Sequence, residues 1–184
     1  MKLTMRLEQD QDAQSPQEDS DLGLFIIANH RDFNVPAPGN ERVDSDPDVE
    51  KSPFTETHWI FPLEAYIHSG VVLAFGREGN FPDRQWDVSQ VGWVFAAKNE
   101  WRLSASARKA AANYIETWNQ YLSSDVWGYV IEDEDGNTVE SCWGFYGAKY
   151  AKEEGESALK HAQAAAEEEA AEVHEMNCRD LVTA

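Results

Sequence analysis

The spacing of hydrophobic residues along the chain predicts an antiparallel sheet covered by one amphipathic helix. Apolar runs of five to seven residues are typical of buried strands, and apolar residues at every third or fourth position are typical of a helix. Strands followed by a helix and then a hairpin favour an α+β domain with a largely antiparallel sheet. The expected elements are strands over 22–28, 58–63, 71–75 and 91–97, and a helix over 104–122 capped by Ser104.

The strongest strand signal is a hairpin over 126–147, VWGYVIEDEDGNTVESCWGFYG. Alternating aromatic and β-branched residues flank Asp135-Gly136, a dipeptide typical of hairpin turns. A two-residue loop there would set Ile131 against Glu140. We favour a three-residue loop, 134–136, with Gly136 in the left-handed conformation that follows a type I turn. This register aligns Trp127, Tyr129 and Ile131 with Trp143, Ser141 and Val139, which gives one apolar face for a core.

Alanine and glutamate dominate after Gly147 and predict a long acidic C-terminal helix. Its apolar side is mostly alanine, so we expect its first turns to dock and its Glu-rich part to project into solvent or pair with another chain. We expect Gly155 to kink or divide it. The predicted organisation is a flexible acidic arm (1–21), a single α+β domain (22–160) with an acidic, proline-rich loop (35–57), and an Ala/Glu-rich C-terminal helix and tail (161–184).

The net charge of −19 is unevenly placed along the chain. Residues 59–123 carry six basic and six acidic side chains, whereas residues 124–184 carry four basic and fifteen acidic ones. Such a field repels nucleic acids and acidic membranes and attracts basic clefts. Direct nucleic-acid binding is therefore not expected, and the alternative is that the acidic excess only maintains solubility.

Cysteine usage and hydropathy indicate a cytoplasmic protein. Cys142 and Cys178 show neither metal-type spacing nor a disulfide framework, which suits a reducing compartment. No apolar stretch approaches the roughly 20 residues of a membrane span, and the N-terminus lacks a hydrophobic signal region.

Three segments form a combined pattern. They are Ser15-Pro16 through Leu22-Gly23 to Asn29-His30-Arg31, Tyr66–Gly70 with Trp86–Gly92, and Tyr121–Tyr129 with Ser141–Gly147. In this pattern, which covers most of residues 15–160, the chain resembles a family of small, mostly uncharacterised proteins encoded by bacteriophages and other mobile elements. Ile27-Ala28 stands where the family tends to have Cys-Trp, and Val88 where it often has Ser-Gly, which argues against a shared metal or nucleophile site. The resemblance implies a phage or mobile-element origin, and hence action in the host cytoplasm.

The acidic residues suggest a DNA-mimicking surface. DNA presents about one negative charge per 1.7 Å of axis, and carboxylates three or four apart on a helix lie about 5–6 Å from each other. Together with the phage origin that the resemblance implies, this leads us to expect a non-enzymatic viral inhibitor, with anti-CRISPR or antirestriction activity, whose partner is a basic host nuclease or CRISPR effector complex. The alternative is an ordinary acidic turn and a solvated helix face. The candidate partner-binding residues are Glu132, Asp133, Glu134, Asp135, Glu140, Glu153, Glu154, Glu168, Glu169 and Glu172.

A small enzyme is the alternative function. Cys142, His68 and Asp87 supply the residue types of a thiol nucleophile, a base and an orienting carboxylate, and Ser69 could replace the thiol. The favoured register sets Cys142 opposite Gly128, where a small partner leaves room for substrate or for a packed helix. A buried structural cysteine is the commoner arrangement.

Metal binding is not expected. His30, His58, His68 and Asp87 lie near strand ends, yet no pair has metal-type spacing. The segment 133–137 lacks the twelve-residue calcium pattern. We predict no cofactor, and we keep open a homodimer through the long helix or the strand edges, and a role as a non-catalytic adaptor.

Overall fold

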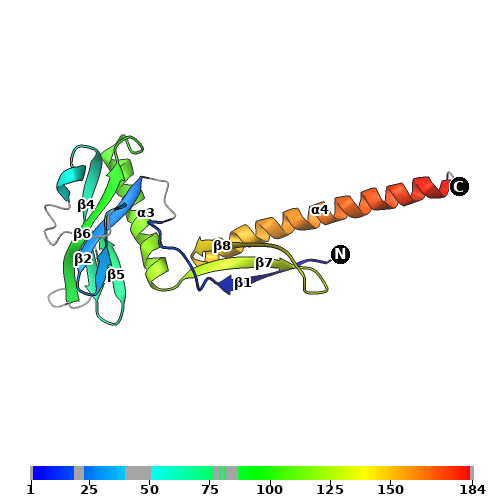
Figure 1. Ribbon diagram of the computed structural model, residues 1–184, viewed down its shortest axis with the longest axis horizontal. Helices are drawn as coiled ribbons and strands as arrows, with labels where there is room; N and C mark the ends of the chain where they lie inside the picture. The colour runs from blue at the N-terminus through cyan, green and yellow to red at the C-terminus, as the bar shows by residue number, and fades with distance from the viewer. Residues whose placement is uncertain are drawn as a thin grey trace. The chain divides into compact units, whose positions relative to one another are not determined.

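The computed structural model describes residues 2–18, 23–39, 51–76, 79, 81 and 87–182, with the side chains of the last helix described through Glu172 and at His174. The chain divides into two compact units. Unit 1 comprises Met1–Ala13 and Ser124–Ala184, and unit 2 comprises Gln14–Ser123. Each unit is α+β with an antiparallel sheet and one α-helix in its described part (Figure 1). The domain expected over 22–160 therefore contains parts of two units, and unit 2 is inserted in sequence between the two segments of unit 1.

Unit 2 holds a five-stranded sheet in the order β3-β2-β6-β4-β5, in which every neighbouring pair is antiparallel. All four strands expected in this part of the chain are present, and β4 and β6 are longer than the apolar runs that predicted them. Segment 40–50 of the predicted acidic loop lies outside the described residues. The elements are β2 (Leu24–His30), β3 (Phe33–Val35), a 3-10 turn η1 (Ser52–Phe54), β4 (His58–Ile67), β5 (Val71–Phe75), β6 (Val88–Ala97) and α3 (Ser104–Leu122).

The expected amphipathic helix is confirmed as α3, which covers one face of this sheet. Its buried residues recur at helical spacing and share one core cluster with the strands. Ser104 is the first helical residue rather than the cap, because Leu103 occupies the N-cap and makes no side-chain hydrogen bond. The buried helical residues are Ala107, Ala111, Tyr114, Ile115 and Trp118.

Unit 1 contains a three-stranded antiparallel sheet in the order β1-β7-β8. The mobile arm expected over 1–21 is wrong for its first part, because residues 4–9 form a strand that pairs with residues 127–132 of β7. Leu3, Met5 and Leu7 alternate with polar residues and supply the apolar face of this strand. The elements are β1 (Thr4–Gln9), β7 (Val126–Glu132), β8 (Thr138–Tyr146) and α4 (Ala148–Val182).

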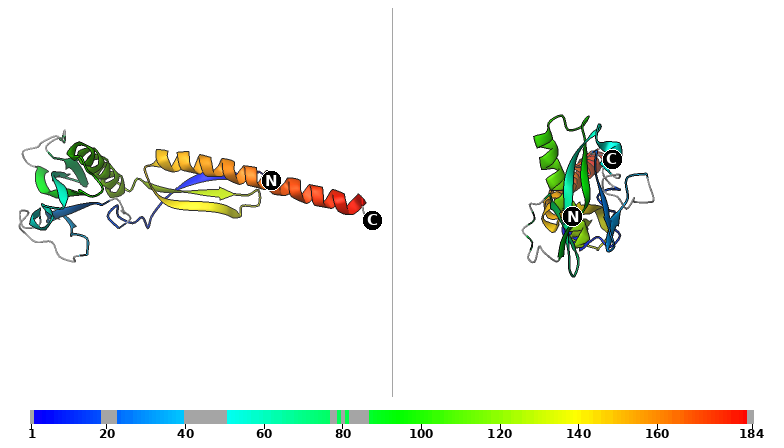
Figure 2. Two further views of the ribbon diagram at one scale, coloured as in Figure 1. Left: turned by 90° about the horizontal axis from the view of Figure 1, so that it is seen from above. Right: turned by 90° about the vertical axis from the view of Figure 1, so that its left-hand side faces the viewer.

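Helix α4 packs along one face of this sheet, as the views in Figures 1 and 2 both show. Its Ala158, Leu159 and Ala162 join Tyr129 and Ile131 in a small core. Gly155 does not kink or divide the helix, which is continuous across it. A Cβ at Gly155 would lie 2.9 Å from the Cβ of Tyr129. The glycine therefore allows close approach of the helix to the central strand.

The turn of the β7–β8 hairpin is the predicted one. Gly136 has φ +82°, its N–H donates to the Asp133 carbonyl at 3.2 Å, and the Asp133 N–H donates to the Asn137 carbonyl at 3.0 Å. These bonds define the three-residue loop 134–136 after a type I turn.

The register beyond that turn differs from the prediction, because β8 contains two bulges. Ile131 faces Glu140 and Tyr129 faces Cys142, instead of Val139 and Ser141. The first irregularity leaves Val139 as an extra residue, and the second sets Trp143 and Gly144 against Gly128, with Gly144 at φ +85°. Val139 and Trp143 are consequently exposed, at 47% and 45%, rather than part of the core.

Candidate functional site

The acidic hairpin tip contains one carboxylate that builds the turn. Asp133 Oδ1 accepts the N–H groups of Asp135 and Asn137 at 2.9 and 2.8 Å, and the Asn137 side-chain amide donates to Asp133 as well. These hydrogen bonds, led by the one from the Asn137 side chain, hold the pKa of Asp133 below its usual value. The carboxylate of Asp133 therefore stabilises the loop and is not free to contact a partner.

Glu132 and Glu140 are also engaged within unit 1. Glu132 accepts two hydrogen bonds from the guanidinium of Arg6, at 3.0 and 3.3 Å, and Arg6 also pairs with Glu8 on its own strand. Glu140 accepts the hydroxyl of Tyr129 at 2.8 Å. Burial of the phenol, followed by its hydrogen bond to Glu140, raises the pKa of Tyr129 to about 12.

Glu134 and Asp135 differ from these three residues. Both are exposed at the tip, and in the described part of the chain their carboxylates make no hydrogen bond or ion pair. Asp135 contributes only its backbone N–H, to Asp133. Of the five acidic hairpin residues expected to contact a partner, two thus present charge that the fold itself does not use.

The acidic residues of α4 fall into two groups. Near its start, Glu153 and Glu156 lie 3.8 Å from Lys149 and Lys152, one helical turn earlier. Further along, the helix is exposed on every side over 167–172, and no lysine or arginine stands within four residues of this segment among positions 163–176. Like charges at this spacing repel each other and weaken the helix by a few tenths of a kcal/mol per pair. The exposed carboxylates of this second group are Glu167, Glu168, Glu169 and Glu172.

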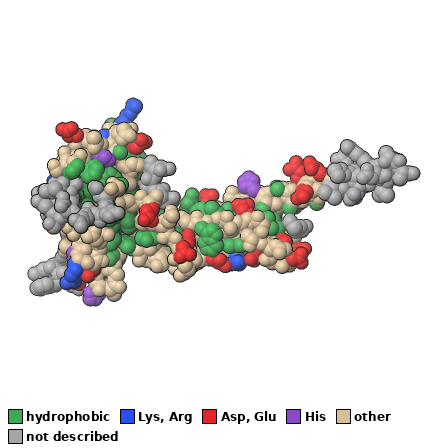
Figure 3. Space-filling model, in the orientation of Figure 1, with side chains coloured by type: hydrophobic (Ala, Val, Ile, Leu, Met, Phe, Trp, Pro, Cys, Tyr) green, Lys and Arg blue, Asp and Glu red, His purple; other side chains and the backbone are tan. Residues whose placement is uncertain are grey.

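The fold brings the hairpin tip and the second helical group to the same end of unit 1. Helix α4 starts after β8 and runs back along the sheet in the direction of β7, with Gly155 against Tyr129. Strand β7 continues for three residues past Tyr129, about 10 Å, and the turn projects beyond it, while each helical residue after Gly155 adds about 1.5 Å. The tip therefore lies alongside α4 beyond Gly155 (Figures 1 and 2), and red carboxylates are seen at that end of unit 1 in Figure 3.

The charge of unit 1 is strongly negative as a whole. Its two segments contain 18 Asp and Glu against 6 Lys and Arg, a net charge of −12. Lys2, which precedes β1, is at the tip end as well and forms no ion pair within the described residues. One lysine offsets only a small part of the six carboxylates there, so this end carries concentrated negative charge.

The catalytic candidates are only partly brought together. His68 and Asp87 lie in unit 2, where Nδ1 of the histidine is 3.9 Å from Oδ2 of the aspartate, and His68 is an exposed residue. Cys142 is on β8 of unit 1, exposed and opposite Tyr129 rather than opposite Gly128. Among the described residues of unit 1, no histidine is shown in contact with this thiol.

The histidines considered as candidate metal ligands have separate surroundings. His30 lies 4.0 Å from Asp32 in the turn after β2, and His58 packs edge-on against Phe25 and Phe54. Burial lowers the pKa of His58, with a smaller effect from the charge of Lys98. Across the described ranges, no three His, Cys, Asp or Glu side chains are grouped so as to hold a metal ion.

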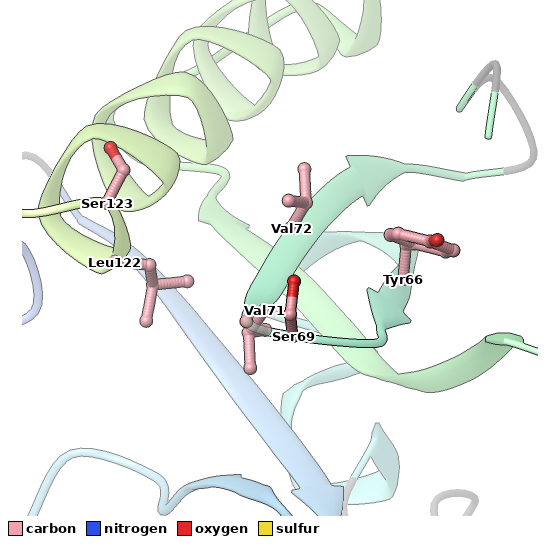
Figure 4. A pocket seen from close by; sticks show the side chains of 7 residues that line it. Tyr66, Ser69, Val71, Val72, Leu122 and Ser123 are labelled. Carbon is pink, nitrogen blue, oxygen red and sulfur yellow. The ribbon is translucent and has the colours of Figure 1, made fainter. Parts of the chain in front are cut away.

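A pocket of about 210 Å³ lies in unit 2 between the β4–β5 turn and the end of α3 (Figure 4). Its polar groups are the hydroxyls of Tyr66, Ser69 and Ser123, and the remaining lining is mostly aliphatic. No carboxylate, imidazole or thiol lines it, so the pocket lacks a base for nucleophilic catalysis.

Two features of unit 1 were missed from the sequence. The pairing of Arg6 with Glu132 depends on β1, which the alternation of Leu3, Met5 and Leu7 would have predicted. The exposure of Trp143 depends on the bulge at Gly144, for which the glycine itself was the available signal.

In the described part of the chain, no helix has the combination of length and apolar character that crossing a membrane requires. No protein-family model, curated protein or solved structure matches this chain.

Proposed function

We propose that unit 1 binds the basic nucleic-acid-binding surface of a host defence protein, a nuclease or a CRISPR effector complex, and blocks its access to DNA. The protein would act in the host cytoplasm as a phage-encoded inhibitor without catalysis of its own. Its long acidic helix and the hairpin tip would supply the charge that DNA phosphates normally supply.

One observation carries this proposal: two segments distant in sequence place unpaired carboxylates at the same end of unit 1. Glu134 and Asp135 come from the hairpin, and Glu167–Glu172 come from α4. Charges that only maintain solubility are usually interspersed with opposite charges, which lowers their mutual repulsion. A basic groove would relieve this repulsion on binding, and association would be fast and sensitive to salt.

The test is inhibition of DNA cleavage by a panel of purified restriction endonucleases and CRISPR effector complexes, at low and high salt. Glu134→Gln with Asp135→Asn should weaken inhibition of a susceptible enzyme about tenfold and lower its salt dependence. Glu168→Gln, Glu169→Gln and Glu172→Gln together should act in the same direction. Glu132 and Asp133 stay unchanged, because their loss would alter the hairpin itself.

The matched control removes two exposed carboxylates from unit 2, by Glu56→Gln with Glu116→Gln. This variant has the same net charge as the hairpin variant and should inhibit like the parent. An equal loss of inhibition in both variants would mean that inhibition depends on the total charge of the protein rather than on the hairpin tip. A parent protein that inhibits no member of the panel would refute the proposed function.

A further inference from the structure

The face of the unit 1 sheet opposite α4 presents an aromatic ring, Trp143, over which no lysine or arginine of the described residues lies. Trp143 follows Cys142, whose partner Tyr129 faces the helix, so the indole projects to the other side. A Cβ at Gly128 would lie 2.3 Å from the Trp143 ring, which shows that the indole lies over this glycine. One face of the ring covers the backbone, yet the residue is 45% exposed.

Two glycines fix the position of this ring. Gly128 leaves the space that the indole occupies, and Gly144, at φ +85°, forms the bulge that turns Trp143 away from the core. Bulges commonly re-aim a side chain towards a functional site. Trp143 is therefore held in place before any partner arrives, which lowers the entropy cost of binding.

The charge around Trp143 favours a cationic group. Across the sheet from it, Gly128 is paired with Glu8 on β1. Arg6 is held between Glu8 and Glu132. Trp59 and Trp93 of unit 2 each have a lysine over the ring, at 5.3 and 4.6 Å, whereas among the described residues no Lys or Arg lies over Trp143.

We propose that Trp143 accepts an arginine or lysine side chain of the basic partner in a cation–π contact. This inference rests on the proposed function and adds to it an aromatic contact on the sheet, at the level of Gly128 rather than at the hairpin tip. Tryptophan is the best aromatic acceptor of a cation, and tryptophan and arginine are enriched among interaction hot spots. A second copy of this chain is the less suitable occupant, because two units of charge −12 repel each other.

The binding test uses a capped peptide of alternating glycine and arginine, and its lysine counterpart, as probes of the full chain. The peptide should shift the indole N–H resonance of Trp143. Trp143→Leu should bind it about three- to tenfold more weakly, with an unchanged salt dependence because no charge is lost. Trp143→Phe keeps the fold and a weaker aromatic acceptor, so its affinity for the peptide should lie between those of the parent and Trp143→Leu.

Tyr150→Leu is the control, since this residue is an exposed aromatic of the same unit, at 52%, on α4. It should bind like the parent. Equal binding by Trp143→Leu and the parent would overturn the inference, and so would concentration-dependent dimers that Trp143→Leu abolishes. The nuclease panel separates the two proposals. If the parent and Trp143→Leu inhibit an enzyme equally, the proposed function stands and the Trp143 contact is refuted. If peptide binding depends on Trp143 but the parent inhibits no enzyme, the contact stands and the proposed function is refuted.

Discussion

Asn119 of α3 replaces a missing strand neighbour of Leu73. Its side-chain carbonyl accepts the Leu73 N–H at 2.7 Å, and its amide donates to the Leu73 carbonyl at 3.0 Å. Leu73 belongs to β5, the edge strand of the unit 2 sheet. An unpaired edge is a template for pairing with other chains. The helix therefore both covers the sheet and closes its edge.

Replacing Asn119 by leucine should destabilise unit 2 by about 1–3 kcal/mol, because a partly buried N–H and C=O lose their partners. Hydrogen exchange at the Leu73 amide, with denaturant unfolding, measures the effect. Asn113→Leu is the control on the exposed side of the same helix. Unchanged protection of Leu73 in Asn119→Leu would show that this edge does not need the amide.

Gly155→Ala should destabilise unit 1 even though alanine is the better helix former. Alanine gains about 1 kcal/mol in an exposed helix interior. Here its Cβ would lie 2.9 and 3.1 Å from Cβ and Cγ of buried Tyr129, and overpacking of a core costs about 1–3 kcal/mol. Hydrogen exchange of the β7 amides reports the net loss.

Ala164→Gly, at an exposed position of the same helix, provides the comparison, with an expected loss of about 1 kcal/mol from propensity alone. Stabilisation by Gly155→Ala would mean that α4 moves away from Tyr129 at little cost, and close approach would then not explain the glycine.

The sequence predicted those elements whose signals are local. The helix over 104–122 has its apolar residues on one stripe, and the loop 134–136 has a glycine where a left-handed residue is required. Both follow from neighbouring residues, so both are found where expected. The division into two units is not local, because it depends on the pairing of β1 with a strand more than a hundred residues later.

The candidate site shows the same limit. Charge patterns identified the acidic residues, but they could not distinguish the unpaired carboxylates of Glu134 and Asp135 from that of Asp133, which is hydrogen-bonded within the turn. A register without bulges could not predict which face of the sheet Trp143 lies on, because each extra residue in β8 changes the alignment of every residue beyond it. Hydrogen bonds and bulges decide which side chains remain available to a partner.

The phenol of Tyr129 should ionise well above the ordinary pKa of a tyrosine. Burial, then the hydrogen bond and charge of Glu140, raises its pKa to about 12 from an ordinary value near 10. A raised tyrosine pKa favours the neutral folded form, so this contribution to stability is complete below about pH 10 and is lost as pH rises towards about 12. Ultraviolet titration of the parent minus Tyr129→Phe isolates the transition.

Glu140→Gln removes the neighbouring charge and should lower the pKa of Tyr129, while burial still holds it above the ordinary value. An isolated transition near pH 10 in the folded parent would contradict the buried, hydrogen-bonded environment of this phenol.

Truncation after Ala166 should separate stability from binding in unit 1. Residues 167–172 are exposed on all sides, whereas Ala158, Leu159 and Ala162 pack on the sheet, so removal of 167–184 should leave the thermal midpoint of unit 1 within a few degrees of the parent. The same truncation removes all four carboxylates of the second helical group and should weaken salt-sensitive inhibition of a susceptible nuclease. Truncation after Ser157 deletes the packed residues too and should unfold the unit, as circular dichroism would show. If the shorter deletion melts much earlier than the parent, the end of α4 supports the fold, and its charge then has a structural rather than a binding role.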